Sequence, residues 1–238
     1  MKQQIFNVDE AAPFIASIDV DGLEKDMLVK LLNEYQVIKQ GHFELLSSLH
    51  SKNFIQFNLF GKTILFSQLL GNYFLKDNID VIFTRDTSSI RLATGIAELL
   101  EKDIVIAPVD ERSYPQEESR EDYEDLTNKK VLIVDDIITT GGGIKRLEKI
   151  CQNYKAEIGG VAAFINRGYK SLKELQEETM IDKFVAICTG KFEHYKNTDC
   201  PICRAEGKTN LVKAKYLNKA ITLTDIRKRI NEKKQQAA

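Results

Sequence analysis

The chain has 238 residues, of which 43% are hydrophobic and 29% are charged. A chain of this length and composition buries a large core without disulfides or metals, and we expect one domain over residues 1–238. Lys and Arg number 34 against 35 Asp and Glu, so the formal net charge is -1. With this balance the protein has no overall positive charge to attract nucleic acid. Any phosphate that it binds must therefore be held by local contacts.

Two other classes of protein do not fit the sequence. No apolar run approaches the roughly 18 residues needed to cross a bilayer, so we expect a cytoplasmic protein without a membrane partner. The four cysteines are too few for a disulfide framework in a chain of this size. Of these, Cys151 follows Ile150 on an expected helix face and is predicted to lie in the core.

The first part of the chain predicts a helix, a strand and a second helix. Apolar residues recur at helical spacing over residues 22–40, and Gly41 can end this helix as a C-terminal cap. Apolar and polar residues alternate over residues 54–59, which predicts a strand. Over residues 63–73 the apolar residues recur again at helical spacing.

Farther along, short apolar runs predict buried strands, with helical segments after the first and third of them. These runs cover residues 81–83, 104–107, 131–134, 161–165 and 184–187. Buried strands that alternate with helices indicate an α/β fold with a mainly parallel sheet covered on both faces. In such sheets the ligand lies at the carboxyl ends of the strands.

Two segments carry no such pattern. Residues 110–130 lack an apolar period and are rich in acidic residues, and a loop of this length is usually functional or disordered. Residues 222–238 form a basic C-terminal tail, for which we expect a solvated helix face; a contact with nucleic acid or a partner is the alternative.

The residues that carry chemistry follow the strand predicted at 131–134. Glycines bring backbone N–H groups close to a ligand, and the start of the next helix favours an anion such as phosphate. Hydroxyl groups donate to the same phosphate, while two adjacent carboxylates suit a neighbouring diol or a hard cation such as Mg²⁺. A phosphate beside a diol describes ribose 5-phosphate. The residues concerned are Asp135, Asp136, Thr139, Thr140, Gly141, Gly142 and Gly143.

Residues 131–143 resemble the phosphoribosyl pyrophosphate (PRPP) motif of the type I phosphoribosyltransferases: four apolar residues, two acids, two apolar residues, Thr-Thr and glycines. The resemblance implies that family's fold, a mainly parallel central sheet flanked by helices, with a small N-terminal hood over residues 1–60. It also implies transfer of ribose 5-phosphate from PRPP to a base with Mg²⁺, and a homodimer.

Among these enzymes the chain is most similar to the orotate phosphoribosyltransferases. Residues 41–51 resemble their signature Phe-x-Leu-x-Ser-Gly-x-x-Ser, with Ser48 for glycine and Phe54 for the following tyrosine. Residues 161–167 resemble a strand that ends in Asp-Arg, with Asn166 for the aspartate. The resemblance makes Phe54 and Arg167 base-binding residues, since a guanidinium pairs with the orotate carboxylate in bidentate fashion. A surface ion pair is the alternative for Arg167.

Two loops depart from the family. Its glycine-rich pyrophosphate loop is replaced by residues 84–89, where Arg85, Thr87 and Ser88 are the candidates to contact PRPP. Arg112 aligns with the arginine that opens the family's mobile loop, and there it would act with Asp135 and Asp136 in catalysis. Acidic residues follow Arg112. We therefore keep two alternatives to the orotate enzyme: a sensor of PRPP or a nucleotide that has lost catalysis, and an enzyme for another base.

The late Cys-Pro-Ile-Cys segment at residues 200–203 allows a metal site. Cys200 and Cys203, together with Cys188 and His194, would supply four ligands that suit a structural Zn²⁺. The alternative is that Cys200 and Cys203 are only two thiols in a loop and bind no metal.

Overall fold

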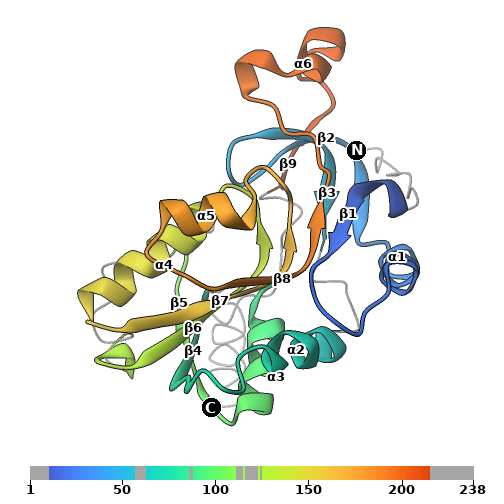
Figure 1. The fold of residues 1–238 in the computed structure, drawn as a ribbon. Coiled ribbons are helices and arrows are strands. Elements are labelled where there is room, and N and C mark those ends of the chain that lie inside the picture. The colour runs from blue at the N-terminus through green and yellow to red at the C-terminus, as the bar shows by residue number, and fades with distance from the viewer. Residues whose placement is uncertain are drawn as a thin grey trace, which may run out of the picture.

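The structure, a computed structural model, describes residues 11–56, 63–85, 88–110, 115, 123 and 125–214. Within these residues a central sheet has the strand order β1-β8-β7-β6-β4-β5 (Figure 1). The neighbouring strands pair in parallel, apart from the edge strand β1, which is antiparallel to β8. The strands are β1 Ile15–Ile18, β4 Val81–Arg85, β5 Asp103–Ala107, β6 Lys130–Ile138, β7 Glu157–Asn166 and β8 Phe184–Gly190.

Helices cover both faces of this sheet, and the alternation of side chains along β6 shows why. Leu132 and Val134 point into a core shared with α1, α2 and α3, whereas Val131 and Ile133 point into a core shared with α4 and α5. All four side chains are fully buried, and each contributes roughly 1.5–3 kcal/mol relative to exposure. The helices are α1 Lys25–Glu34, α2 Thr63–Asn72, α3 Ile90–Leu100, α4 Gly142–Asn153, α5 Leu172–Glu178 and α6 Pro201–Glu206, with short 3-10 turns at Ala12–Phe14 and Asn197–Asp199.

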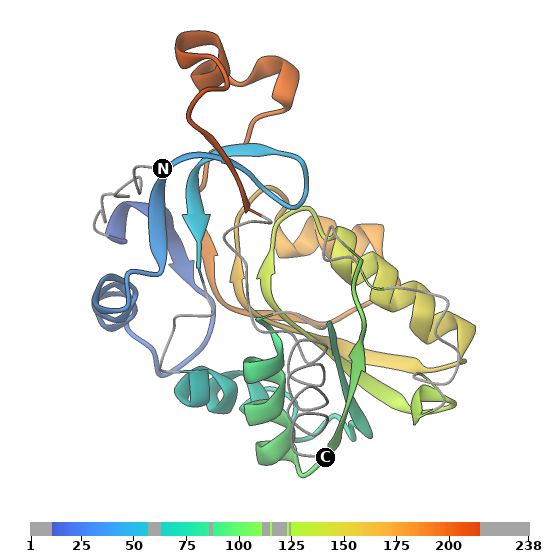
Figure 2. The ribbon, with the colours of Figure 1, turned by 180° about the vertical axis from the view of Figure 1, so that it is seen from behind.

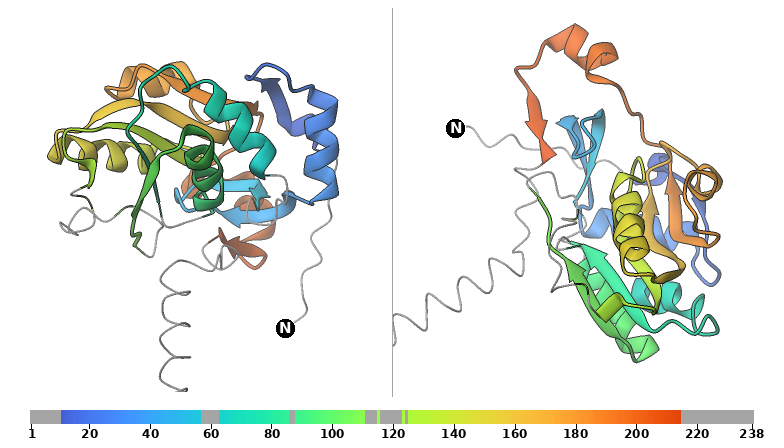
Figure 3. Two further views of the ribbon diagram at one scale, coloured as in Figure 1. Left: turned by 90° about the horizontal axis from the view of Figure 1, so that it is seen from below. Right: turned by 90° about the vertical axis from the view of Figure 1, so that its left-hand side faces the viewer.

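A second, smaller sheet forms the hood at one end of the molecule, with α6 beyond it (Figures 1 and 2). Its strands are β2 Ile38–Glu44, β3 His50–Ile55 and β9 Leu211–Lys213, in the order β3-β2-β9. The hairpin β2–β3 is antiparallel, and β9 adds to β2 in parallel. The hood therefore combines the predicted N-terminal segment with a strand from far along the chain, which Figure 3 shows beside the blue hairpin.

The predicted pattern of buried strands and helices is confirmed, including Cys151, which is fully buried in the core between the sheet and α4. The helix predicted over residues 22–40 is wrong beyond Glu34. The chain turns there through Gln36, whose φ is 50°, and β2 then begins at Ile38 and runs through Gly41. The strand expected at 54–59 is instead His50–Ile55, and residues 57–59 lie outside the described part.

The described part of the predicted acidic loop is anchored to the core. Tyr123 and Leu126 are fully buried, and the Tyr123 ring packs edge-on against Phe83 of β4 with centroids 5.8 Å apart. The acidic residues at 117–122 and the basic tail at 222–238 lie outside the described residues. Within the residues described, none of the helices is both long and apolar enough to span a bilayer.

Candidate active site

The PRPP-like segment forms the strand, loop and helix predicted for it. Strand β6 ends at Ile138, and α4 begins at Gly142 after a short turn through Thr139 and Thr140. Gly141 has a φ of 78°, and a Cβ atom at this position would lie 2.5 Å from Leu175 Cδ2. Only glycine fits this turn without strain.

We expect Gly141→Ala to lower the free energy of unfolding by more than the ~1–2 kcal/mol that a left-handed conformation alone costs. Gly22 is a matched control, since it has a φ of 77° and no atom lies within 4 Å of a Cβ built there. Urea unfolding of both variants measures the difference. An equal loss in Gly141→Ala and Gly22→Ala would show that Leu175 moves aside at no cost.

The two carboxylates of the segment are buried and held by residues at the end of the neighbouring strand and just after it. Asp135 and Asp136 are 2% and 4% exposed. Because β4 lies next to β6 in parallel, its end brings Arg85 to Asp135, with 2.5 Å between Nη2 and Oδ1. The Ser88 hydroxyl donates to Asp136 Oδ2. Burial, and then the charge of Asp135, raises the pKa of Asp136 from 3.8 to about 7.

The Arg85 guanidinium also reaches the glycine turn. A Cβ atom built on Gly143 would lie 3.2 Å from Arg85 Cζ, so the guanidinium packs against the first turn of α4. A cation beside backbone N–H groups at a helix start is an arrangement that suits a phosphate group. The structure thus brings together Arg85, Ser88, both aspartates and the glycines that the sequence singled out.

Arg167 lies directly beside this turn. It follows β7, and its backbone N–H donates to the carbonyl oxygen of Ile138 at 2.8 Å. Its side chain donates from Nη2 to Ser51 Oγ and to the Asn53 carbonyl oxygen on β3, each at 3.1 Å. The hood hairpin therefore covers Arg167, which is only 2% exposed.

The surroundings of Arg167 are neutral. Its Nε donates to His194 Nε2 at 3.2 Å, and its Cζ lies 4.6 Å from the centre of the Phe192 ring. Burial, and then the charge of Arg167, lowers the pKa of His194 to about 4, so this imidazole is neutral at pH 7. Burial lowers the pKa of Arg167 itself to about 9. Among the described residues, no carboxylate lies within ion-pair distance of Arg167.

Three other predicted residues are placed differently or not at all. Phe54 is 4% exposed and packs against Phe43 in the small core of the hood, with ring centroids 5.6 Å apart. Its contact with a base remains a prediction. Thr87 and Arg112 lie outside the described residues. Sequence reasoning missed Ser51 and Asn53 as partners of Arg167, because only the pairing of hood and sheet brings them together.

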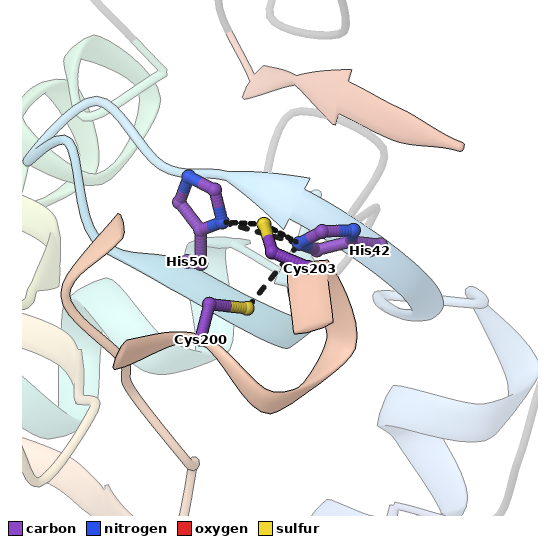
Figure 4. Close-up of side chains that lie close together, drawn as sticks. All are labelled: His42, His50, Cys200 and Cys203. Carbon is purple, nitrogen blue, oxygen red and sulfur yellow. Dashed lines mark hydrogen bonds between the residues drawn. The ribbon is translucent and has the colours of Figure 1, made fainter. Parts of the chain in front are cut away.

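The structure does not bring the four predicted zinc ligands together. The structure places Cys200 and Cys203 with His42 and His50, and the four ligand atoms lie within 4.8 Å of one another (Figure 4). Cys188 is instead fully buried in β8, with Sγ 4.0 Å from the Phe164 carbonyl oxygen, and His194 accepts from Arg167. The overlooked signal is that His42 and His50 lie on the two arms of one hairpin.

Comparison with known proteins agrees with this geometry. A family model described as the phosphoribosyl transferase domain matches residues 62–195. A curated relative named orotate phosphoribosyltransferase, from Caldanaerobacter subterraneus subsp. tengcongensis, is 26% identical over 189 residues, which cover 76% of this chain and 93% of the relative. A second of the same name, from Caldicellulosiruptor saccharolyticus, is 28% identical and covers 76% and 92%.

Solved structures share the fold at lower identity. The orotate phosphoribosyltransferase from Aeropyrum pernix has a TM-score of 0.51 at 19% identity, covering 68% of this chain and 94% of that one. A phosphoribosyltransferase from Corynebacterium diphtheriae has a TM-score of 0.54 at 18% identity, covering 69% and 95%. The fold of this chain thus has counterparts of known structure.

Proposed function

Since the chain belongs to the family of phosphoribosyl transferase domains, and is thus a glycosyltransferase, we propose that it transfers ribose 5-phosphate from PRPP to orotate and releases pyrophosphate. The choice of orotate as acceptor rests on one observation: Arg167 is a buried cation with neutral partners, and it lies beside the PRPP-like turn. A buried charge is costly unless it is paired. The carboxylate of orotate would supply the missing negative charge, and for bidentate pairing it would replace Ser51 or Asn53 as a partner of Arg167 Nη2.

The ribose and phosphate groups of PRPP fit the residues around β6. In our proposal the turn at residues 139–143 holds the 5-phosphate through backbone N–H groups and the threonine hydroxyls. Asp135 and Asp136 accept hydrogen bonds from the two ribose hydroxyls. For this, Arg85 and Ser88 must leave the carboxylate oxygens that they contact in this structure. Both can then turn to the pyrophosphate group.

Breaking the bond between ribose C1 and pyrophosphate builds positive charge on the ribose ring. The two carboxylates lie where they would stabilise that charge, while Arg85 would stabilise the negative charge on the leaving group. The oxygen atoms of Asp135 and Asp136 are donors of the kind that Mg²⁺ prefers. When bound with PRPP, Mg²⁺ would neutralise the departing pyrophosphate. Arg112 stays a predicted catalytic residue, which would also stabilise the negative charge on the departing pyrophosphate.

The direct test is loss of orotate absorbance when the purified protein is mixed with PRPP and Mg²⁺. Binding of PRPP is followed by calorimetry on the same sample. We expect turnover with orotate and little or none with uracil, which lacks the carboxylate. Turnover with another base but not orotate would contradict the acceptor that we assign to Arg167, and absence of PRPP binding would contradict the whole proposal.

A second candidate is a sensor that binds PRPP or a nucleotide without transfer. It is favoured by the contacts of Arg85 and Ser88, which occupy one oxygen of each carboxylate. Binding without turnover on any of several bases would support it. A cytoplasmic homodimer of single-domain chains remains a prediction, and light scattering of the purified protein measures the oligomeric state.

A further inference from the structure

Outside the candidate active site, four side chains that typically bind metals meet between the hood and α6. His42 comes from β2, His50 from β3, and Cys200 and Cys203 from the start of α6 (Figure 4). Three of them are buried, at 1% to 4% exposure, and Cys203 is half-buried. No other such group of His, Cys, Asp and Glu occurs in the part of the chain that the structure describes.

Four of the six distances within this group lie close to those of a tetrahedral metal site. Zn–N bonds of about 2.05 Å and Zn–S bonds of about 2.3 Å at tetrahedral angles place two nitrogens about 3.4 Å apart, and a nitrogen and a sulfur about 3.6 Å apart. His42 Nε2 and His50 Nδ1 are 3.1 Å apart. The nitrogen–sulfur distances are 3.5 and 3.6 Å from His42 and 3.3 Å from His50.

We propose that His42 Nε2, His50 Nδ1 and the thiolates of Cys200 and Cys203 bind one structural Zn²⁺ ion. Two imidazoles and two thiolates are a common donor set for zinc in proteins, and a site with four protein ligands leaves no position for a reacting water. An open pocket gives the ion a path to His42. It is lined by Gly41 and Lys52 from the hood and by Ile202 and Glu206 from α6.

The ion would join parts of the chain that lie far apart in sequence. His42 and Cys200 are 158 residues apart in sequence. The strand that follows the cysteines, β9, is only 3 residues long and pairs with β2 from Leu211 opposite His42. A metal that holds α6 to β2 and β3 therefore stabilises the addition of β9 to the hood.

The same ion would position two partners of Arg167. His50 precedes Ser51, which accepts from Arg167 Nη2. The His50 backbone pairs with that of Tyr195 through hydrogen bonds of 2.8 and 2.9 Å, and Tyr195 follows His194, which accepts from Arg167 Nε. The zinc site thus supports the base side of the active site, although its existence does not depend on the proposed reaction.

The test is the metal content of the full chain, purified under reducing conditions and measured by mass spectrometry, alone and after addition of Zn²⁺. We expect about one zinc per chain in the wild-type protein and almost none in Cys203→Ser. Cys188→Ala and Cys151→Ser are the controls, since both cysteines are buried far from the group. Both controls should keep the metal. Removal of zinc by a chelator should lower the melting temperature of the wild-type protein and not that of Cys203→Ser.

Substitution with Co²⁺ gives a readout that does not depend on folding stability. A tetrahedral site with two thiolates produces strong visible bands and a sulfur-to-metal charge-transfer band, and Cys203→Ser should weaken the charge-transfer band. Three results would overturn the proposal: no zinc in the reduced wild-type protein even after its addition, loss of zinc in Cys188→Ala with retention in Cys203→Ser, or a count of free thiols that shows a disulfide between Cys200 and Cys203.

Discussion

Asp136→Asn is expected to reduce phosphoribosyl transfer by at least about 10²-fold to 10³-fold, the range seen when one group that stabilises transition-state charge is removed. The asparagine keeps the shape of the side chain and can still accept from Ser88. It lacks the negative charge that stabilises positive charge on the ribose ring. Steady-state rates with PRPP and orotate measure the loss, and Asp103→Asn, at an exposed position at the start of β5, is the control.

The same variant should be more stable than the wild-type protein at pH 8. The pKa of Asp136 is raised from 3.8 to about 7 by burial and by Asp135, so the folded protein holds this proton more tightly than the unfolded chain does. The resulting stability is fully present below pH 3.8 and is lost as the pH rises to about 7. The asparagine of the variant has no proton to lose. Melting temperatures at pH 5 and pH 8 should therefore differ less in Asp136→Asn than in the wild-type protein.

A stable Asp136→Asn protein would separate the two proposed functions. In an enzyme the variant loses the turnover that the wild-type protein has. In a sensor neither protein turns over, and only the affinity for PRPP changes in calorimetry. An Asp136→Asn protein that retains the wild-type rate would remove this carboxylate from the mechanism. A protein that unfolds would contradict the expected gain in stability and show that the amide group is not accommodated beside Asp135 and Ser88.

The central sheet and the PRPP-like turn could be predicted because both follow from local sequence. Residues 131–134 form an uninterrupted apolar run, which is the pattern of a strand buried on both faces, and Gly141 follows where a left-handed turn is needed. The contact between Arg85 and Asp135 could not be predicted, because it joins residues 50 apart through the adjacency of β4 and β6. Strand order is not encoded in either segment alone.

Two predictions, the helix over residues 22–40 and the set of zinc ligands, failed because local sequence does not decide them. Residues 22–40 keep the helical period past Glu34, although the chain turns at Gln36 and Ile38 starts a strand; over a few residues, the two periods cannot be separated. The predicted zinc set added Cys188 and His194, which lie shortly before Cys200 in sequence. The structural set depends on the pairing of β2 with β3 and on the return of the chain to the hood, both of which are long-range.

Arg167→Lys is expected to raise the KM for orotate by about 10-fold to 10²-fold, since a hydrogen bond to a charged group contributes roughly 1.5–3 kcal/mol. Lysine keeps the positive charge but cannot bind a carboxylate through two parallel N–H groups. The affinity for PRPP should stay unchanged in calorimetry, because the ribose and phosphate contacts come from β6 and its turn. Arg91→Lys, at an exposed position on α3, is the matched control.

Arg167 also connects the hood to the sheet, so its role in binding must be separated from a role in packing. Ser51→Ala removes one of the hydrogen bonds that hold the guanidinium and leaves the charge in place. If Arg167 binds the base, Ser51→Ala should raise the KM for orotate only slightly, and Arg167→Lys should narrow the preference for orotate over uracil. If Arg167 only packs, both variants should lower the melting temperature together and leave that preference unchanged. The second outcome would mean that the hydrogen bonds of the guanidinium and its contact with the Phe192 ring offset the cost of burying this cation, without a bound anion.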